Sequence, residues 1–359
     1  MLEIKDLCVQ MGAFSLRNVN LEVKDGEYFV LLGPTGAGKS VLLESVAGLN
    51  AVTSGQVWIN GNDVTSLNLE KRSIGFAYQD YTLYRHLSVR DNISFGLMWK
   101  DRKQRDIDKA VDQAIELLGL HNLLEKKSPS LSGGESQKIA LARAIAIKPD
   151  LLLLDEPLSA VDSETKEDYE RELKELHNRL RLTTIHVTHN FEEAVALGDR
   201  IAVIMKGQVL QVGTPQEIFH HPQSELAARF LMTRNIFQGE VSTGADGQPV
   251  FSVEGTGMSV ITDLRGGLQA SLRPEDIFIS RQLLSSGLNN LQGTVTRIVD
   301  RGSVIYATVK VPPEFICLTH RRSLKEIDLK EGEQVYISFQ ASDVNVFEKE
   351  SLGNASPSP

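Results

Sequence analysis

Gly33-Pro34-Thr35-Gly36-Ala37-Gly38-Lys39-Ser40 is the stretch that decides the fold of this chain. It follows an apolar run at 28–32, typical of a buried strand, and precedes apolar residues at helical spacing that end at Gly48. A strand, a glycine turn carrying Lys-Ser and a helix are together typical of a phosphate-binding P-loop. Its backbone N–H groups and the helix N-terminus attract a polyphosphate. We therefore expect nucleotide binding, with Lys39 on the outer phosphates and the Ser40 hydroxyl on a magnesium ion.

Composition and charge limit the possible functions. With 359 residues the chain exceeds what one hydrophobic core usually covers, so two domains are expected. A net charge of -9 gives no electrostatic footprint for nucleic acid. Cys8 and Cys317 match no metal-ligand spacing, and few cysteines without a signal peptide favour a reducing cytoplasm. No apolar run approaches the roughly 18 residues that span a bilayer, so any membrane role requires a partner.

Strand and helix patterns alternate over the first 235 residues. This alternation predicts a mainly parallel α/β sheet with ligands at the carboxyl ends of its strands. Apolar residues at helical spacing over 87–124 indicate a helical subdomain, within about 87–135. The other expected helices are 136–147 and 169–180. The expected strands are 2–9, 19–23, 28–32, 55–60, 74–79, 151–154, 183–187 and 201–205.

The pattern changes after residue 235. Short β-rich runs broken by Gly and Pro over 236–352 predict a small all-β barrel domain, with one short helix near Leu324. The polar, Pro-rich tail 353–359 is expected to be disordered.

Acidic and histidine side chains follow two of the buried strands. Asp155 and Glu156 end the strand at 151–154, at the sheet edge where the P-loop is expected. Asp155 is placed to bind magnesium, and Glu156 to orient or deprotonate a water molecule near the terminal phosphate. His189 follows the strand 183–187 and is expected to contact the γ-phosphate, whereas His186 lies inside that strand and is expected to pack.

Leu131-Ser132-Gly133-Gly134-Glu135 opens the helix expected at 136–147. Ser132 and Glu135 have the spacing of a capping box, so a purely structural interpretation exists. This interpretation leaves the paired glycines unexplained. Glycines without side chains make their backbone N–H groups accessible to an anion. If the helical subdomain holds this stretch away from the P-loop of its own chain, a second copy of the chain would have to present it.

These motifs and their order resemble the ATP-binding cassette (ABC) ATPases, over about the first 230 residues. The resemblance implies a P-loop NTPase (RecA-like) domain, and ATP with Mg²⁺ bound by residues 33–41, with Ser40, Gln79 and Asp155 as metal ligands. The corresponding motifs are Walker A at 33–40, the Q-loop Gln79, the signature at Leu131 to Glu135, Walker B at 151–155 with Glu156 as catalytic base, the D-loop Ser159-Ala160-Val161-Asp162 and the switch His189.

In the family, two cassettes form a head-to-tail dimer in which each signature acts on ATP held by the other P-loop. Ser132 and Gly134 would therefore act on ATP bound to the partner, Gly133 and Asp162 are further expected nucleotide-binding residues, and Lys39, Gln79, Glu156 and His189 serve catalysis. Such cassettes are peripheral on the cytoplasmic membrane face, bound to two permease subunits and served by a solute-binding protein. The aromatic-rich run after Gln79 is expected to be mostly core, although some of it could receive the permease.

Several residues depart from the family pattern. Glu135 and Lys138 replace the usual Gln and Arg. Val41 stands where a second hydroxyl often contacts the α-phosphate, so that hydrogen bond is lost. Met11 stands near the position of the ring that usually stacks on adenine, with Phe14 the nearest aromatic, so weaker adenine discrimination is expected.

The C-terminal region resembles the TOBE extension, an OB-like β domain, of importer ATPases, and most of all the molybdate/tungstate type. The resemblance rests on 271–275, 289–293, 319–323 and 341–344. In that group the domain can bind the oxyanion and hold the transporter shut. Candidate donors are Ser285, Ser286, Arg321, Arg322, Ser323 and Ser342, but Leu288 and Gln340 stand where relatives often have cations, so a purely structural barrel is an equal alternative.

We therefore predict the ATP-hydrolysing subunit of a prokaryotic importer of molybdate or tungstate. An importer of sulfate, a polyamine or a sugar is the alternative within the same class. A soluble ABC protein of translation or DNA repair usually has two cassettes in one chain or long coiled coils, and this sequence has neither. A mainly sensory role is disfavoured by Glu156 and His189.

Overall fold

The computed structural model describes residues 1–80, 83–98, 103–124, 126, 130–162, 164–245, 247–284, 288–320 and 329–348. The helix expected near Leu324, the tail 353–359 and the candidate donors Ser285, Ser286, Arg321, Arg322 and Ser323 lie outside these ranges. The chain divides into two compact units, Met1–Pro215 and Gln216–Pro359.

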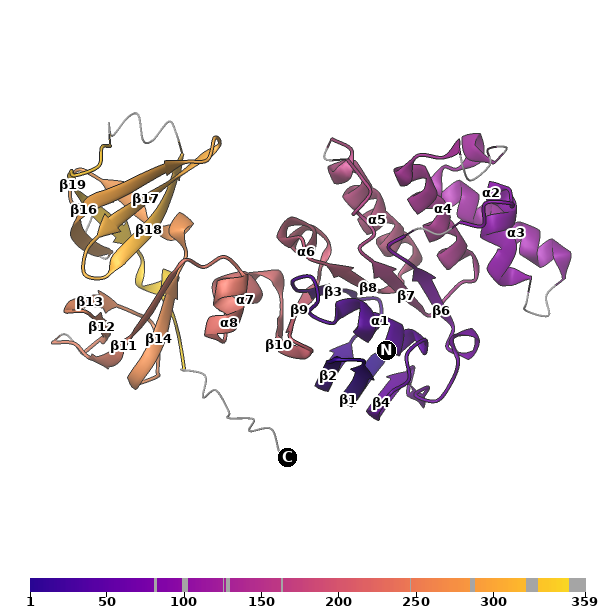
Figure 1. The fold of residues 1–359 in the computed structure, drawn as a ribbon, viewed down its shortest axis with the longest axis horizontal. Helices are drawn as coiled ribbons and strands as arrows, with labels where there is room; N and C mark the ends of the chain where they lie inside the picture. The colour runs from indigo at the N-terminus through magenta and orange to yellow at the C-terminus, as the bar shows by residue number, and fades with distance from the viewer. Residues whose placement is uncertain are drawn as a thin grey trace. The chain divides into compact units, whose positions relative to one another are not determined.

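The first unit holds two sheets (Figure 1). Its described strands are β1 Leu2–Met11, β2 Phe14–Val23, β3 Tyr28–Leu32, β4 Ser54–Ile59, β5 Asn62–Asp63, β6 Ile74–Ala77, β7 Leu151–Asp155, β8 Thr183–Thr188, β9 Arg200–Met205 and β10 Gln208–Gly213. One sheet has the order β2-β1-β4-β5 and is antiparallel. The other has the order β10-β9-β3-β8-β7-β6 and is parallel except for β10.

Both sheets and α1 share one hydrophobic core. Every residue of β3 is buried, and every residue of β7, which explains why these strands read as continuous apolar runs. Leu42, Leu43 and Val46 of α1 pack into the same core. Burial of each such side chain contributes about 1.5–3 kcal/mol. This packing holds the carboxyl ends of β3 and β7 at the same edge of the sheet, with β8 between the two strands.

The helices of the first unit begin where the sequence supplies caps. They are α1 Lys39–Ala47, α2 Val89–Ser94, α3 Gln104–Leu118, α4 Gly133–Ala146, α5 Lys166–Leu180 and α6 Phe191–Leu197. Helix α4 starts three residues before the expected 136 because Ser132 and Glu135 form a complete capping box. The paired glycines therefore belong to its first turn. Helices α2 and α3 form the expected helical subdomain together with α4.

The aromatic-rich run of this subdomain is less buried than expected. Leu83 is buried, but Tyr84 is 37% exposed and Met98 is 65% exposed. Tyr81 and Trp99 lie outside the described residues. Phe95 is half-buried against the Tyr84 ring, so the expectation that most of the run is core is met only in part by the residues that the structure describes.

The second unit contains α7 Pro215–His220 and α8 Glu225–Phe230 followed by antiparallel strands. Its described strands are β11 Asn235–Thr243, β12 Pro249–Val253, β13 Thr256–Ser259, β14 Gly266–Leu272, β15 Phe278–Ser280, β16 Asn289–Asp300, β17 Val304–Lys310, β18 Glu314–His320, β19 Gln334–Phe339 and β20 Asn345–Phe347. They form sheets of order β13-β12-β11-β14-β20 and β15-β19-β16-β17-β18 around one core. Phe251, Phe315 and Phe339 are fully buried there. An all-β C-terminal domain was expected.

The boundary between the units lies earlier than the expected 235/236. The reason is that the segment with α8 is bonded to the β strands of its own unit. Glu225 of α8 accepts a hydrogen bond from Gln269 of β14, and the Pro222 carbonyl accepts one of 2.7 Å from Asn345 of β20. These contacts assign α8 to the second unit, which also includes α7 after its first residue.

Candidate functional site

The P-loop joins β3 to α1 in a conformation that needs glycine. Gly38 has φ +103°, and a Cβ there would lie 2.5 Å from the Phe14 ring. The Lys39 ammonium donates to the carbonyls of Gly33 at 2.8 Å and Pro34 at 3.0 Å, and so lies over the loop. Burial lowers the Lys39 pKa, although the carboxylates of Glu156 and Asp155 oppose this shift. The loop thus presents a cation and the N-terminus of a helix to one point, as polyphosphate binding requires.

Ser40 and Asp155 meet beneath the loop. The Ser40 hydroxyl donates to Asp155 Oδ1 at 3.1 Å. Burial raises the pKa of Asp155 to about 6; the Ser40 hydrogen bond opposes this shift, and the neighbouring Glu156 and Glu44 add to it. A carboxylate crowded by other carboxylates is stabilised by a cation.

The donor chemistry of Ser40 and Asp155 decides whether the pair suits Mg²⁺. Within the described ranges, no group of three or more His, Cys, Asp and Glu side chains is arranged to hold a metal ion by itself. Mg²⁺ does not need such a cage, because it usually takes one or two protein oxygens and completes its shell with water and phosphate. Ser40 and Asp155 supply two adjacent oxygens, so the donor set fits. Gln79 bonds Glu156 instead of this pair.

Glu156 lies between two other expected catalytic residues. Its Oε1 is 3.0 Å from His189 Nδ1, and its Oε2 accepts a 3.3 Å bond from the Gln79 amide. The Glu156 side chain is 16% exposed and His189 57%. Glu156 has φ +47°, a strained conformation for a residue with a side chain. Strain of this kind is common at functional sites.

A cleft of about 420 Å³ extends from these groups to Met11 and Phe14. It brings together ten of the fifteen residues predicted for the nucleotide site of one chain, and Gly33, Pro34, Ala37, Asp155 and His189 do not line it. The lining residues are Met11, Phe14, Thr35, Gly36, Gly38, Lys39, Ser40, Val41, Gln79 and Glu156. Met11 is 43% exposed, whereas the Phe14 ring contacts Gly38. Both side chains line the cleft, and the Phe14 ring also packs against the loop at Gly38.

The signature stretch does not line this cleft. The hydroxyl of Ser132 accepts from the Glu135 N–H, Glu135 accepts from the Ser132 N–H, and Lys126 pairs with Glu135 at 2.9 Å. A Cβ at Gly134 would meet nothing within 4 Å, so this residue faces open space. The structure thus leaves Ser132 and Gly134 apart from the P-loop cleft of their own chain.

The D-loop lies beside the signature. A Cβ on Gly133 would lie 3.3 Å from the Ala160 carbonyl. Asp162 is bonded inside the chain: it accepts from the N–H of Thr165 at 3.1 Å and from its hydroxyl at 2.9 Å. These bonds lower the Asp162 pKa. Asp162 therefore fixes the start of α5.

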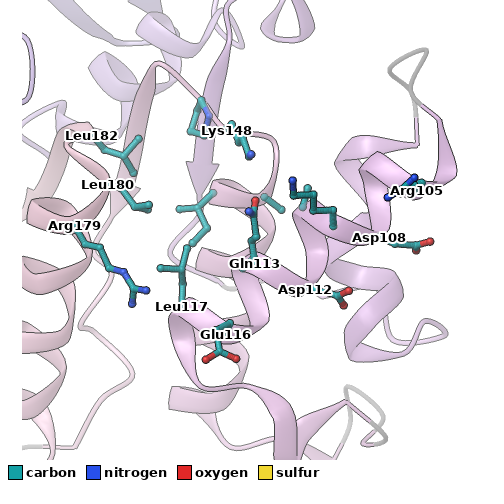
Figure 2. Close-up of a pocket in the computed structure, with 16 residues that line it drawn as sticks. Arg105, Asp108, Asp112, Gln113, Glu116, Leu117, Lys148, Arg179, Leu180 and Leu182 are labelled. Carbon is teal, nitrogen blue, oxygen red and sulfur yellow. The ribbon is translucent and has the colours of Figure 1, made fainter.

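A larger cleft, of about 1090 Å³, lies elsewhere in the first unit. Figure 2 shows Leu117 of α3 facing Leu180 and Leu182, with Arg179 and Lys148 at the rim. None of the residues assigned from the motifs lines it. Its size alone gives it no role in nucleotide chemistry.

In the second unit, the described oxyanion candidate is Ser342. It is exposed in a short turn, where its hydroxyl lies 3.4 Å from both Gln340 Oε1 and Asp343 Oδ1. Leu288 is half-buried just before β16. These residues alone do not form an anion site.

Sequence reasoning missed a buried group next to His189. Glu193, Lys166 and Thr188 form an ion pair and a hydrogen bond there. One local signal existed, since Asn190 and Glu193 have capping spacing, and Asn190 does accept the Glu193 N–H. His186 is fully buried as expected, with its Nδ1 3.0 Å from the Tyr28 hydroxyl.

Comparison with protein families gives matches in both units. Residues 16–159 match the ABC transporter family, and residues 270–347 match the TOBE domain. The chain is 39% identical to a molybdate/tungstate import ATP-binding protein of Pyrococcus abyssi, over 97% of this chain and 100% of that protein. It is 36% identical to a sulfate/thiosulfate import ATP-binding protein of Nitrosomonas europaea, over 96% of each.

Other relatives and solved structures extend the comparison. A spermidine/putrescine import ATP-binding protein of Borreliella afzelii is 35% identical, over 97% of this chain and 99% of that protein. A solved ATP-binding cassette, dimeric in a post-hydrolysis state with ADP and Pi, has a TM-score of 0.54 and 30% identity, over 60% of this chain and 99% of that chain.

Proposed function

Because the chain belongs to the ABC transporter ATP-binding proteins, we propose that it is the ATP-hydrolysing subunit of a molybdate or tungstate importer. The observation that carries the proposal is the placement of Glu156 between Gln79 and His189 at the mouth of the P-loop cleft. ATP and water are the substrates, and ADP and phosphate are the products.

The residues of this chain divide the reaction between them. Lys39 holds the outer phosphates, and Ser40 with Asp155 would hold Mg²⁺, which neutralises phosphate charge when bound. Glu156 orients a water molecule and accepts its proton as the water oxygen attacks the γ-phosphorus. The bond from this phosphorus to the bridging oxygen breaks, and ADP leaves. His189, whose Nδ1 lies 3.0 Å from Glu156 Oε1, contacts the γ-phosphate next to Glu156.

The site requires a second copy of the chain in this proposal. Ser132 is exposed, Gly134 is half-buried beside open space, and both lie outside the P-loop cleft, while related cassettes have been solved as dimers. Paired signature glycines of one copy would place backbone N–H groups against ATP on the other.

Membrane permease subunits are the proposed partners to which the energy of ATP binding and hydrolysis is transmitted. No helix in the described part of the chain is long and apolar enough to cross a membrane. The exposed Tyr84 and Met98 of the helical subdomain, with Tyr78 next to the Q-loop, offer an apolar surface for a permease. Gln79 would connect that surface with the ATP. This arrangement gives a peripheral protein on the cytoplasmic membrane face.

Uptake measurements test the function and the cargo. In host cells, Glu156→Gln is expected to abolish uptake of radioactive molybdate and tungstate, while its exposed control Glu192→Gln does not. Loss of sulfate, polyamine or sugar uptake instead would reassign the cargo. A purified chain that hydrolyses ATP while Glu156→Gln leaves all uptake unchanged would favour a soluble ABC ATPase.

The second unit is proposed to bind the cargo oxyanion. Hydroxyl and cationic donors suit molybdate, and Ser342 is the described candidate. Calorimetry on the full chain is expected to give heat with molybdate or tungstate, none with phosphate, and less with Ser342→Ala. Absence of heat with either metal oxyanion would leave a structural β domain.

A further inference from the structure

Glu193 is a buried carboxylate that the proposed reaction does not use. It lies in the first turn of α6 and is 6% exposed. Its Oε1 is 2.7 Å from Lys166 Nζ, and its Oε2 accepts the Thr188 hydroxyl at 2.5 Å. His186 Nε2 lies 3.6 Å from the same Oε2. Elements that are distant in sequence thus meet at one carboxylate.

The residues on both sides of His189 are tied to Glu193. Thr188 donates its hydroxyl hydrogen to Glu193 and accepts the Asn190 N–H at 3.0 Å. Asn190 in turn accepts the Glu193 N–H at 3.1 Å. The backbone that carries His189 is therefore closed into a hydrogen-bonded ring. The side chain of His189 is not part of this ring, and its Nδ1 lies 3.0 Å from Glu156 Oε1.

Lys166 brings the D-loop into this arrangement. It is the first residue of α5 and follows Thr165, which Asp162 fixes through its N–H and its hydroxyl. The Lys166 side chain is 21% exposed and that of Glu193 7%, so water screens the pair little. A displacement of the segment around Asp162 would act on Glu193 through this ion pair.

We propose that Glu193 is a positioning residue for His189, and that Lys166 couples this position to the D-loop. This inference rests on the proposed role of His189 in ATP hydrolysis. The Lys166–Glu193 pair sets where the imidazole stands relative to Glu156. A partner copy that binds at 159–162 thereby influences the histidine of the same chain.

The charge state of Glu193 suits a permanent connection. Burial opposes ionisation, but His186, Lys166 and Thr188 outweigh burial and hold the Glu193 pKa at about 2. The carboxylate is therefore charged at any working pH. The pair acts through geometry, and not as a pH switch.

Variants at Lys166 separate positioning from simple structural support. In the full chain, Lys166→Met is expected to lower kcat for ATP by tenfold to roughly 100-fold, since a displacement of about 1 Å can cost that much. The KM for ATP is expected to change less than twofold, and Lys166→Arg is expected to restore most of kcat. Arg171→Met is the matched control, because Arg171 pairs with Asp168 on the exposed face of the same helix.

Two further measurements probe the histidine itself. In the His189→Ala background, Lys166→Met is expected to cause no additional loss of single-turnover rate. Nitrogen-15 spectra of the imidazole, assigned by the signal missing in His189→Ala, should show a shifted His189 Nδ1 resonance in Lys166→Met but not in Arg171→Met. The spectra need no turnover.

The outcomes distinguish this inference from the proposed function. Wild-type kcat or an unshifted His189 resonance in Lys166→Met, alongside a His189→Ala variant with strongly reduced but measurable turnover, overturns the positioning role alone. Wild-type turnover by His189→Ala overturns the role of His189 and the inference with it. A loss confined to KM would show that Lys166 affects ATP binding and would also overturn the inference.

Discussion

Ser40 and Asp155 are 115 residues apart in sequence, and the hydroxyl of Ser40 donates a 3.1 Å hydrogen bond to the Asp155 carboxylate. The sheet order explains this contact, because β8 alone separates β3 from β7. The carboxyl ends of parallel strands meet at the same edge, so the loop after β3 and the last residue of β7 converge. The strand order of the sheet is therefore sufficient to bring Ser40 and Asp155 together without a bound ligand.

Asp155→Asn should remove the magnesium dependence of ATP binding. Mg²⁺ is expected to strengthen ATP binding by the wild type at least about tenfold, or 1.4 kcal/mol, and to leave the variant unchanged. Fluorescence titration with a labelled ATP, with Mg²⁺ or EDTA, measures this difference. Glu44→Gln is the control, because Glu44 is a nearby carboxylate that bonds Asn50 and not Ser40. Equal magnesium dependence in Asp155→Asn would remove Asp155 from the metal site.

Met11 is predicted to contact adenine. Met11→Tyr is expected to tighten ATP binding by about 0.5–1.5 kcal/mol, the range for stacked aromatic pairs, and Met11→Ala to weaken it. The preference for ATP over GTP should rise in the tyrosine variant, and a strong preference already in the wild type would argue against a weak base site. Met98→Ala is the control, since Met98 is exposed in the helical subdomain. Calorimetry with each nucleotide provides the values.

Glu193→Gln is predicted to destabilise the fold in a pH-dependent way. The folded-state pKa of about 2 lies below the ordinary 4.5, so ionised Glu193 stabilises the fold above pH 4.5. That contribution, on the order of 3 kcal/mol, is lost as the pH falls from 4.5 toward 2. The gap in urea midpoint between wild type and variant should therefore be largest near pH 7 and shrink below pH 4.5. Exposed Glu192→Gln should show no gap, and a gap that grows toward acid pH would contradict the assignment.

Local sequence patterns predicted the elements that carry the ATP site. Continuous apolar runs marked β3 and β7, and the glycine turn marked the start of α1, because burial and backbone geometry there depend on adjacent residues. The all-β character of the second unit was equally visible. These features placed Lys39, Ser40 and Glu156 correctly on their elements.

Long-range contacts explain what the patterns could not predict. The domain boundary shifts because Glu225 bonds Gln269, 44 residues away. Lys166 and Glu193 meet only when α5 and α6 pack, so the capping spacing of Asn190 and Glu193 could mark a helix start but not this ion pair. Met98 belongs to a run that was expected to be mostly core, yet its side chain is largely exposed, since apolar composition alone does not tell which members of a run are buried.

The action of Ser132 on ATP bound to another copy is predicted to be visible by complementation. Lys39→Ala disables the P-loop, and Ser132→Arg places a bulky cation in the signature, so each variant alone should be inactive. A mixed dimer would hold both defects in one composite site and leave the other site intact. With random pairing, about half of the dimers are mixed, and each mixed dimer has one working site. Mixing the two chains should therefore restore up to about half of the ATP hydrolysis that would be seen if every dimer had one working site.

The reason for recovery is geometric. Ser132 and Gly134 lie outside the P-loop cleft of their own chain, so an intact signature on the Lys39→Ala chain can serve only a partner. Mixing Lys39→Ala with Lys39→Ala/Ser132→Arg is the control and should stay inactive, since no intact P-loop is present. If the signature acted on ATP in its own chain, each chain of the test mixture would carry a defect in its own site, and the mixture would not hydrolyse ATP. Phosphate release after mixing thus decides whether the loop at 33–40 is half of a shared site or a complete one.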